Sequence, residues 1–256
     1  MNAMVKNPLA SRIQPINQFC EKHHGEQMFE MMGRPFCKKC SLEALEQARS
    51  SVQTQSDFAN MQAEKRMSNA MLPHRHKHCA FENYRTDHDG QANAKAESIR
   101  FYQGFLRKKM RNLVMVGRTG TGKTHLACAL ARNLLAKKQN IRYITSEDMV
   151  NKIAETWSKK QLGETEASMI ARFVDCDLLI LDEYGLHDQH ETRLQLVHKV
   201  LYARYNARKP TMLISNFTKQ QLQENLGDRL WSRFQEDHMT MVECDWEDTR
   251  SKQVAL

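Results

Sequence analysis

The stretch GRTGTGKT, residues 117–124, constrains the fold of this chain more than any other feature. It fits the pattern G-x-x-x-x-G-K-[ST] at every fixed position, with Gly117, Gly122, Lys123 and Thr124. An apolar run precedes it and leucines recur at helical spacing after it, so this loop should join a buried strand to a helix. Glycines let backbone N–H groups surround a phosphate, and the start of a helix favours negative charge. The sequence therefore predicts a phosphate-binding loop.

Two side chains of this loop have expected roles. We expect Lys123 to reach the β- and γ-phosphates of a nucleotide, and the Thr124 hydroxyl to coordinate Mg²⁺. The residues expected to hold the nucleotide and its ion are Gly117, Thr119, Gly120, Thr121, Gly122, Lys123, Thr124, His125 and, further along the chain, Asp182.

The chain from residue 112 onward alternates apolar runs of strand length with helical stretches. The expected strands are 112–117, 140–146, 176–183, 210–216 and 239–244, and helices are expected after the loop to about 137, then to about 158, and over 191–207. Near-continuous apolar strands separated by helices are typical of a buried parallel sheet. The predicted fold class is therefore α/β.

The run LLILDE carries two carboxylates to the end of a buried strand. Asp182 is expected to hold Mg²⁺ together with Thr124, and Glu183 to polarise a water for attack on the γ-phosphate. This pair favours hydrolysis over phosphoryl transfer to an acceptor molecule, for which no pocket or lid signal is found. ATP is favoured over GTP, because the sequence contains no N-K-x-D guanine motif.

Further polar residues lie where they could sense the γ-phosphate. Asn216 ends the apolar run PTMLISN and could touch the phosphate or orient the water. Arg229 and Arg233 in LGDRLWSRF lie one helical turn apart, and are either a solvated basic face or a contact to a neighbouring subunit's nucleotide. Arg250 in DWEDTR could be a second phosphate sensor.

Two Cys/His pairs near the N-terminus predict a metal site. Cys20-x₂-His23 and Cys37-x₂-Cys40 are separated by 13 residues, which is compatible with a small tetrahedral Zn²⁺ module. His24 is a rival for His23 as the ligand. The segment HRHKHC (residues 74–79) is expected to be a solvated basic linker rather than a second site.

The predicted organisation has three parts. Residues 1–72 form an N-terminal unit with a loose tail (1–18), the zinc module and a helix (41–72), residues 73–90 are a linker, and residues 91–256 form the ATPase domain. The formal charge of +8 suits an anionic partner such as nucleic acid. There is no apolar run of membrane length and no signal peptide, so no membrane association and a cytoplasmic location are expected.

The motifs together resemble the AAA+ class of P-loop ATPases, and more narrowly the DnaC/DnaI-type helicase loaders and the related IstB transposition ATPases. GRTGTGKTHLACALA, LLILDEYG, LISN, LGDRLWSR, DWEDTR and the upstream AFENY carry this resemblance, over about residues 78–256. It implies a five-stranded parallel sheet in the order 5-1-4-3-2 with helices on both faces. It also implies roles: Lys123, Thr124, Asp182 and Glu183 match the Walker motifs, Asn216 matches sensor 1, Arg233 matches the arginine finger with Arg229 as its companion, and Arg250 matches sensor 2.

The same resemblance implies a function. A helicase loader would bind a replicative hexameric helicase of the DnaB type through residues 1–72, self-associate through the ATPase domain, and help to load the helicase onto single-stranded DNA, with weak intrinsic ATPase activity. Zinc modules also occur at the N-termini of such loaders. The alternative is an IstB-like ATPase that binds DNA and assists a transposase.

Overall fold

The computed structural model describes residues 13–109, 112–158, 163–186, 190–236 and 238–248. The chain divides into two compact units, the first ending at Gln62 and the second beginning at Ala63. This division falls inside a single helix, α1 (Lys38–Asn69). The functional boundaries predicted at residues 72 and 90 stay a prediction.

The first unit contains a small antiparallel sheet in the order β1-β2-β3. Its strands are β1 (Ile13–Phe19), β2 (Gln27–Met31) and β3 (Arg34–Phe36). The prediction of a loose tail over residues 1–18 is therefore wrong for residues 13–18. These residues pair with β2, with Ile13 opposite Met31, and residues 1–12 lie outside the described part of the chain. In the described part of this unit, the buried apolar residues are Cys20 and Cys37.

Helix α1 begins three residues before the predicted start at 41 and ends three before the predicted end at 72. Its sequence from Ser41 to Asn69 has no Gly and no Pro and is rich in strong helix formers. Several large apolar side chains stay exposed: Leu42, Leu45, Phe58 and Met61. After the helix, Ala70 is completely buried and Met71 has a left-handed φ of 57°.

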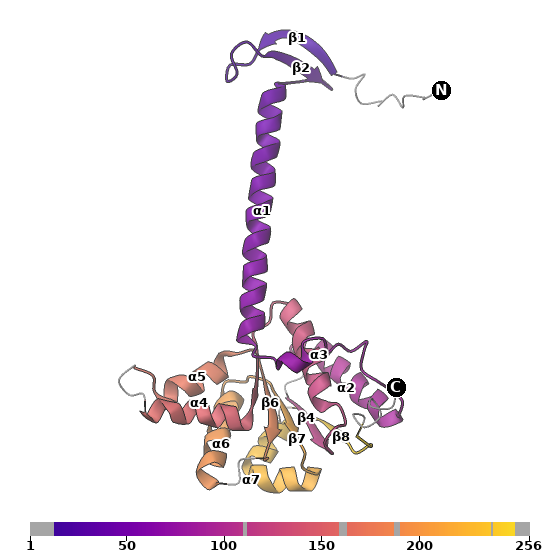
Figure 1. Ribbon diagram of the computed structural model, residues 1–256, viewed down its shortest axis with the longest axis vertical. Coiled ribbons are helices and arrows are strands. Elements are labelled where there is room, and N and C mark those ends of the chain that lie inside the picture. The colour runs from indigo at the N-terminus through magenta and orange to yellow at the C-terminus, as the bar shows by residue number, and fades with distance from the viewer. Residues whose placement is uncertain (1–12, 110–111, 159–162, 187–189, 237, 249–256) are drawn as a thin grey trace. The chain divides into compact units, whose positions relative to one another are not determined.

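The second unit is built on a five-stranded parallel sheet in the order β5-β6-β7-β4-β8 (Figure 1). The strands are β4 (Asn112–Gly117), β5 (Ile141–Thr145), β6 (Leu178–Tyr184), β7 (Thr211–Ser215) and β8 (Thr240–Cys244). Counting from β4 as the first strand, this is the order 5-1-4-3-2, so the prediction is confirmed.

Helices cover both faces of this sheet (Figure 1). One face packs against α2 (Asp89–Leu106) and α3 (Lys123–Ala136); the other packs against α4 (Ser146–Ser158), α5 (Glu166–Asp175), α6 (Glu191–Asn206) and α7 (Lys219–Glu236). Strand β4 contributes side chains to the cores on both faces of the sheet, because successive side chains of a strand point to opposite faces. Leu113 and Met115 join the first core, and Val114 and Val116 join the second. Helix α5 was not predicted.

A buried arginine lies near the residues where β6 and β7 begin. Arg204 of α6 is completely buried, and its guanidinium donates to the carbonyl oxygens of Phe173 (2.6 Å), Cys176 (3.3 Å) and Pro210 and to the Thr211 hydroxyl (3.1 Å). It thereby satisfies backbone acceptors between α5 and β6 and before β7. Among the described residues, no helix combines the length and apolarity needed to cross a bilayer.

Candidate nucleotide-binding site and metal cluster

The loop between β4 and α3 has the backbone that its glycines predict. Gly117, Gly120 and Gly122 all have positive φ, at 118°, 80° and 88°. A β-carbon at Gly117 would lie 2.2 Å from the carbonyl oxygen of Cys244 on β8, so no larger residue fits. The loop is therefore shaped by close backbone approach as well as by left-handed conformations.

The side chain of Lys123 lies inside the loop. It is 6% exposed, and its Nζ donates to the carbonyl oxygens of Gly117 and Arg118, both at 2.7 Å. The structure thus brings the ammonium to the centre of the loop, where phosphate oxygens can replace these two carbonyl oxygens as its hydrogen-bond acceptors. The predicted contact with β- and γ-phosphates stays a prediction.

Asp182 lies at the end of β6 and meets the loop as predicted. Its Oδ2 accepts from the Thr124 hydroxyl at 2.8 Å, and its Oδ1 accepts from the Glu183 N–H at 2.7 Å. A carboxylate beside a hydroxyl is an oxygen donor set that suits Mg²⁺, so these two residues fit the ion that the family implies.

A third donor to Asp182 was not foreseen. The Tyr143 hydroxyl on β5 donates to Asp182 Oδ2 at 2.6 Å. Burial, and next the Asp182 charge, raise the pKa of Tyr143, so the phenol stays protonated and remains a donor. Its position was predictable only from the register, because β5 and β6 are neighbours and Tyr143 lies two residues before Thr145, which pairs with Asp182.

These residues line a cavity of about 470 Å³. The predicted residues that line it are Thr119, Gly120, Thr121, Gly122, Lys123, Thr124, His125, Asp182, Glu183 and Asn216. Glu183 and Asn216 are both exposed, and Glu183 has a strained φ of 56°. Two further residues, Arg75 and His76, were not predicted as site residues and line the same cavity from the 3₁₀ turn η2 (His74–His76).

The apex of the loop is held from both ends of the second unit. The Thr121 carbonyl accepts from the Tyr84 hydroxyl and from Trp246 Nε1, both at 3.1 Å. These donors belong to the motifs AFENY and DWEDTR. His125 Nε2 lies 3.0 Å from both the Ala80 carbonyl oxygen and Asn83 Oδ1, so the AFENY segment also contacts the start of α3.

The predicted arginines lie apart from this cavity or outside the described chain. The Arg233 guanidinium on α7 lies over two aromatic rings, 4.7 Å from the Tyr202 centroid and 4.8 Å from that of Tyr205. Arg229 is exposed, and Arg250 lies outside the described residues. An arginine remote from its own site is compatible with action on a neighbour's nucleotide, which stays a prediction.

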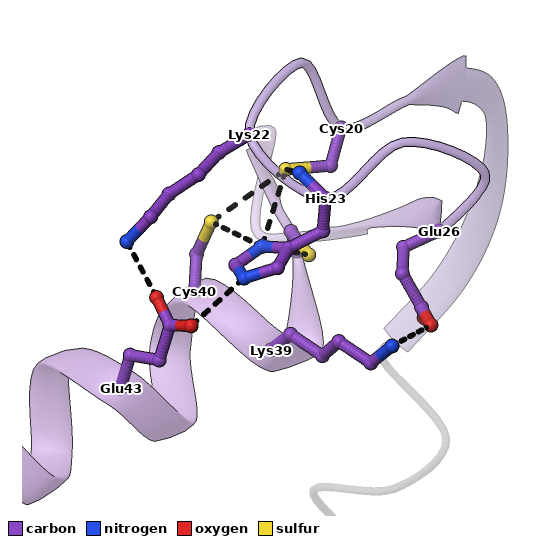
Figure 2. A network of polar contacts seen from close by, with 8 residues as sticks. Cys20, Lys22, His23, Glu26, Lys39, Cys40 and Glu43 are labelled. Atoms are coloured by element: carbon purple, nitrogen blue, oxygen red, sulfur yellow. Dashed lines mark hydrogen bonds and ion pairs between the residues drawn. The ribbon is translucent and has the colours of Figure 1, made fainter.

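The four predicted zinc ligands gather in one cluster, and Figure 2 labels three of them, Cys20, His23 and Cys40. The donor atoms of Cys20, His23, Cys37 and Cys40 all lie within 4.8 Å of one another. The Cys20 and Cys40 sulfurs are 3.6 Å apart, and His23 Nδ1 lies 3.7, 3.9 and 3.3 Å from the sulfurs of Cys20, Cys37 and Cys40. In a tetrahedron around Zn²⁺, sulfurs lie about 3.8 Å apart and a sulfur and a nitrogen about 3.6 Å. The donor set and its spacing therefore fit zinc.

His23, rather than its rival His24, lies in the cluster. His23 Nε2 lies 2.8 Å from Glu43 Oε1, so Nδ1 faces the sulfurs while the other ring nitrogen is held by a carboxylate (Figure 2). His24, the rival, is exposed and lies outside the cluster. Lys22 and His23 keep the pKa of the Glu43 carboxyl below its ordinary value, so it stays an ionised acceptor.

The thiols of the cluster have shifted pKa values. The His23 N–H lowers the pKa of Cys20, while hydrogen bonding to Cys20, burial and the neighbouring Cys37 raise the pKa of Cys40 to about 11. A divalent cation would favour the thiolate form of these cysteines. In the segment HRHKHC, His76 Nδ1 and Cys79 Sγ are 3.4 Å apart, but the described residues contain no second cluster of metal-ligating side chains.

The strand order and this loop define a P-loop nucleotide-binding protein of the AAA+ class. The family described as "IstB-like ATP binding protein" matches residues 40–247, and the chain belongs to that family. Among curated proteins, the replicative helicase loader DnaC of Escherichia coli (strain K12) is 27% identical over 177 residues, which are 69% of this chain and 71% of DnaC. DnaC of Buchnera aphidicola subsp. Schizaphis graminum (strain Sg) is 26% identical over 67% of this chain and 69% of its own length.

Solved structures show the same fold. A crystal structure of the DnaC helicase loader superposes with a TM-score of 0.58 at 21% identity, covering 68% of this chain and 100% of that one. AMPPCP-bound DnaA from Aquifex aeolicus superposes with a TM-score of 0.58 at 23% identity, covering 72% of this chain and 54% of DnaA. The predicted resemblance to DnaC-like, IstB-related AAA+ ATPases is thus confirmed.

Proposed function

We propose that this protein is a DnaC-like helicase loader, an ATP-dependent switch that binds a hexameric DnaB-type replicative helicase and helps to load it onto single-stranded DNA. The observation that supports this best is a P-loop cavity lined by the predicted Walker residues, in a chain that aligns over 69% of its length with the loader DnaC. The family description "IstB-like ATP binding protein" is also compatible with the alternative, assistance to a transposase, but the alignment with DnaC favours the loader.

The chemistry proposed for the site is hydrolysis of ATP, with Mg²⁺ supplying charge stabilisation at the phosphates. Lys123 neutralises developing charge on the β- and γ-phosphates, while Thr124 and Asp182 hold the ion. Glu183, exposed at the cavity wall, accepts a proton from the attacking water, and Asn216 orients that water or touches the γ-phosphate.

The finer roles of the arginines depend on assembly. Arg233 acts on the nucleotide of a neighbouring copy, so that self-association completes the site, and Arg250 is a second phosphate sensor. Intrinsic turnover is then weak and rises with assembly on single-stranded DNA, to which the formal charge of +8 is suited.

The N-terminal unit is proposed to bind the helicase. Cys20, His23, Cys37 and Cys40 hold one Zn²⁺, which stabilises a unit whose described residues bury almost no apolar side chains. The exposed side chains of Leu42, Leu45, Phe58 and Met61 offer apolar contacts to a protein partner.

The deciding experiment is a pull-down with a hexameric replicative helicase. Full-length protein should retain the helicase, and a variant that lacks residues 1–62 should not, although the second compact unit, which begins at Ala63, is left intact. If the full-length protein does not retain the helicase, and instead binds along duplex DNA when ATP is present, the transposase-assisting alternative replaces this proposal. Transfer of the γ-phosphate to an acceptor molecule rather than to water would refute the hydrolytic switch.

A further inference from the structure

The segment that follows helix α1 reaches the nucleotide cavity. It runs from Ala70, which is completely buried, to the 3₁₀ turn η2, and both belong to the second unit. From this turn Arg75 and His76 line the cavity together with the phosphate loop and the carboxylates of β6. The sequence alone predicted a solvated linker here.

The Arg75 side chain has the properties of an anion ligand. It is exposed, and among the described residues it has no carboxylate within ion-pair distance. The cavity that it lines already contains Lys123, so two cations face the same space. A guanidinium is always protonated and donates two parallel hydrogen bonds to a phosphate, which makes it a phosphate ligand wherever such a group comes within reach.

Arg75 shares this cavity with residues that are expected near the terminal phosphate. The residues that share the lining with it include Asp182, Glu183 and Asn216, which are the groups expected around the Mg²⁺ ion and the γ-phosphate. We propose that Arg75 contacts the terminal phosphate of ATP in cis, so that the segment after α1 distinguishes ATP from ADP. This proposal rests on the proposed ATP-binding function of the site.

The other end of the segment is tied to the same site through Tyr143. The Tyr143 N–H donates to the Ala70 carbonyl at 2.8 Å, and its hydroxyl donates to Asp182 at 2.6 Å. One residue therefore links the carboxylate expected to hold Mg²⁺ to the residue that follows α1. The segment thus reaches the nucleotide cavity directly at Arg75 and is linked to Asp182 through Tyr143 at Ala70, and a change at the terminal phosphate alters its restraint.

The consequence is a direct path of regulation along the chain. Cys40 of the metal cluster lies in the first turn of α1, and Ala70 follows the last turn of the same helix. A nucleotide-dependent restraint at Ala70, transmitted through Tyr143 on β5, therefore acts on the helix that carries the proposed helicase-binding unit.

The first test measures nucleotide affinity on the full-length protein with Mg²⁺, using fluorescent mant-ATP and mant-ADP. Arg75→Ala should weaken mant-ATP binding about tenfold and mant-ADP binding less than threefold, and Arg75→Lys should recover part of the loss. Lys77→Ala is the matched control, because Lys77 is an exposed cation two residues away that does not line the cavity. If the Arg75→Ala variant has the same affinities for mant-ATP and for mant-ADP as the Lys77→Ala variant, the proposal is overturned.

The second test measures hydrogen exchange at the Tyr143 amide, whose N–H bonds to Ala70. The amide should exchange more slowly with a non-hydrolysable ATP analogue than with ADP in the wild type, and this difference should vanish in Arg75→Ala. Equal exchange in both nucleotides, with both shown to be bound, would overturn the proposed discrimination. A wild-type protein that binds no ATP would instead refute the proposed function itself.

Discussion

The contact between Glu43 and His23 allows a quantitative test of the metal cluster. Glu43 Oε1 lies 2.8 Å from His23 Nε2, while His23 Nδ1 faces the three sulfurs. A carboxylate in this position fixes the tautomer and the orientation of a ligating ring, and its loss typically weakens metal binding by about 10–100-fold. The Glu43 side chain is 41% exposed, so water can partly replace it. We therefore expect the lower end of this range, about a tenfold loss of zinc affinity in Glu43→Ala.

The assay is competition for Zn²⁺ with a chromophoric chelator at neutral pH. Glu43→Gln should bind zinc more tightly than Glu43→Ala, because the amide oxygen still accepts from the ring. Glu46→Ala is the matched control, since Glu46 is an exposed glutamate one turn further along α1 and lies outside the cluster. If Glu43→Ala and Glu46→Ala hold zinc with affinities within twofold of each other, the ring is not oriented by Glu43. Should even the wild type contain no zinc, the metal site itself is refuted.

Three further predictions concern a buried arginine, two buried cysteines and an arginine expected to act in trans. Arg204→Met should lower the free energy of unfolding by about 3 kcal/mol or more in a denaturant titration, because several buried carbonyl oxygens lose their donor; a change below about 1 kcal/mol would contradict this. Burial raises the pKa of Cys128 and of Cys244 to about 12, so at pH 8 both should stay protonated and react with a thiol reagent only after unfolding, and rapid labelling of the native protein would show otherwise. Mixing Arg233→Ala with Lys123→Ala protein should restore part of the ATPase activity if the arginine acts in trans; proven assembly without restoration would count against that role.

Buried parallel strands made the core of the fold predictable. The run NLVMVG was assigned as a strand over 112–117, and β4 has these bounds, because a strand covered on both faces is apolar throughout. The phosphate loop was equally accessible to prediction, since its glycines and Lys123 are required by backbone geometry and charge that any such loop shares. The meeting of Thr124 and Asp182 followed from the resulting sheet.

Three features depended on contacts that no local pattern reveals. Strand β1 is exposed along nearly its whole length, so it lacks the alternation that marks a half-buried strand, and its existence depends on pairing with β2. Tyr143 looks like an ordinary core residue, and only the register of β5 against β6 brings its hydroxyl to Asp182. Arg75 sits in a basic, histidine-rich segment whose composition resembles a linker, while tertiary packing places it at the cavity.

The Thr121 carbonyl, which accepts from both Tyr84 and Trp246, has a practical consequence for dissecting the molecule. The donors are far apart in the chain, one before the sheet begins and one after it ends, yet both hold the same peptide of the phosphate loop. A fragment that starts after Tyr84 or stops before Trp246 would keep all five strands and still lose a restraint on the loop. Loss of nucleotide binding in such a fragment would then report a loosened loop rather than a missing ligand, and limits for a minimal ATPase fragment should lie outside residues 84–246.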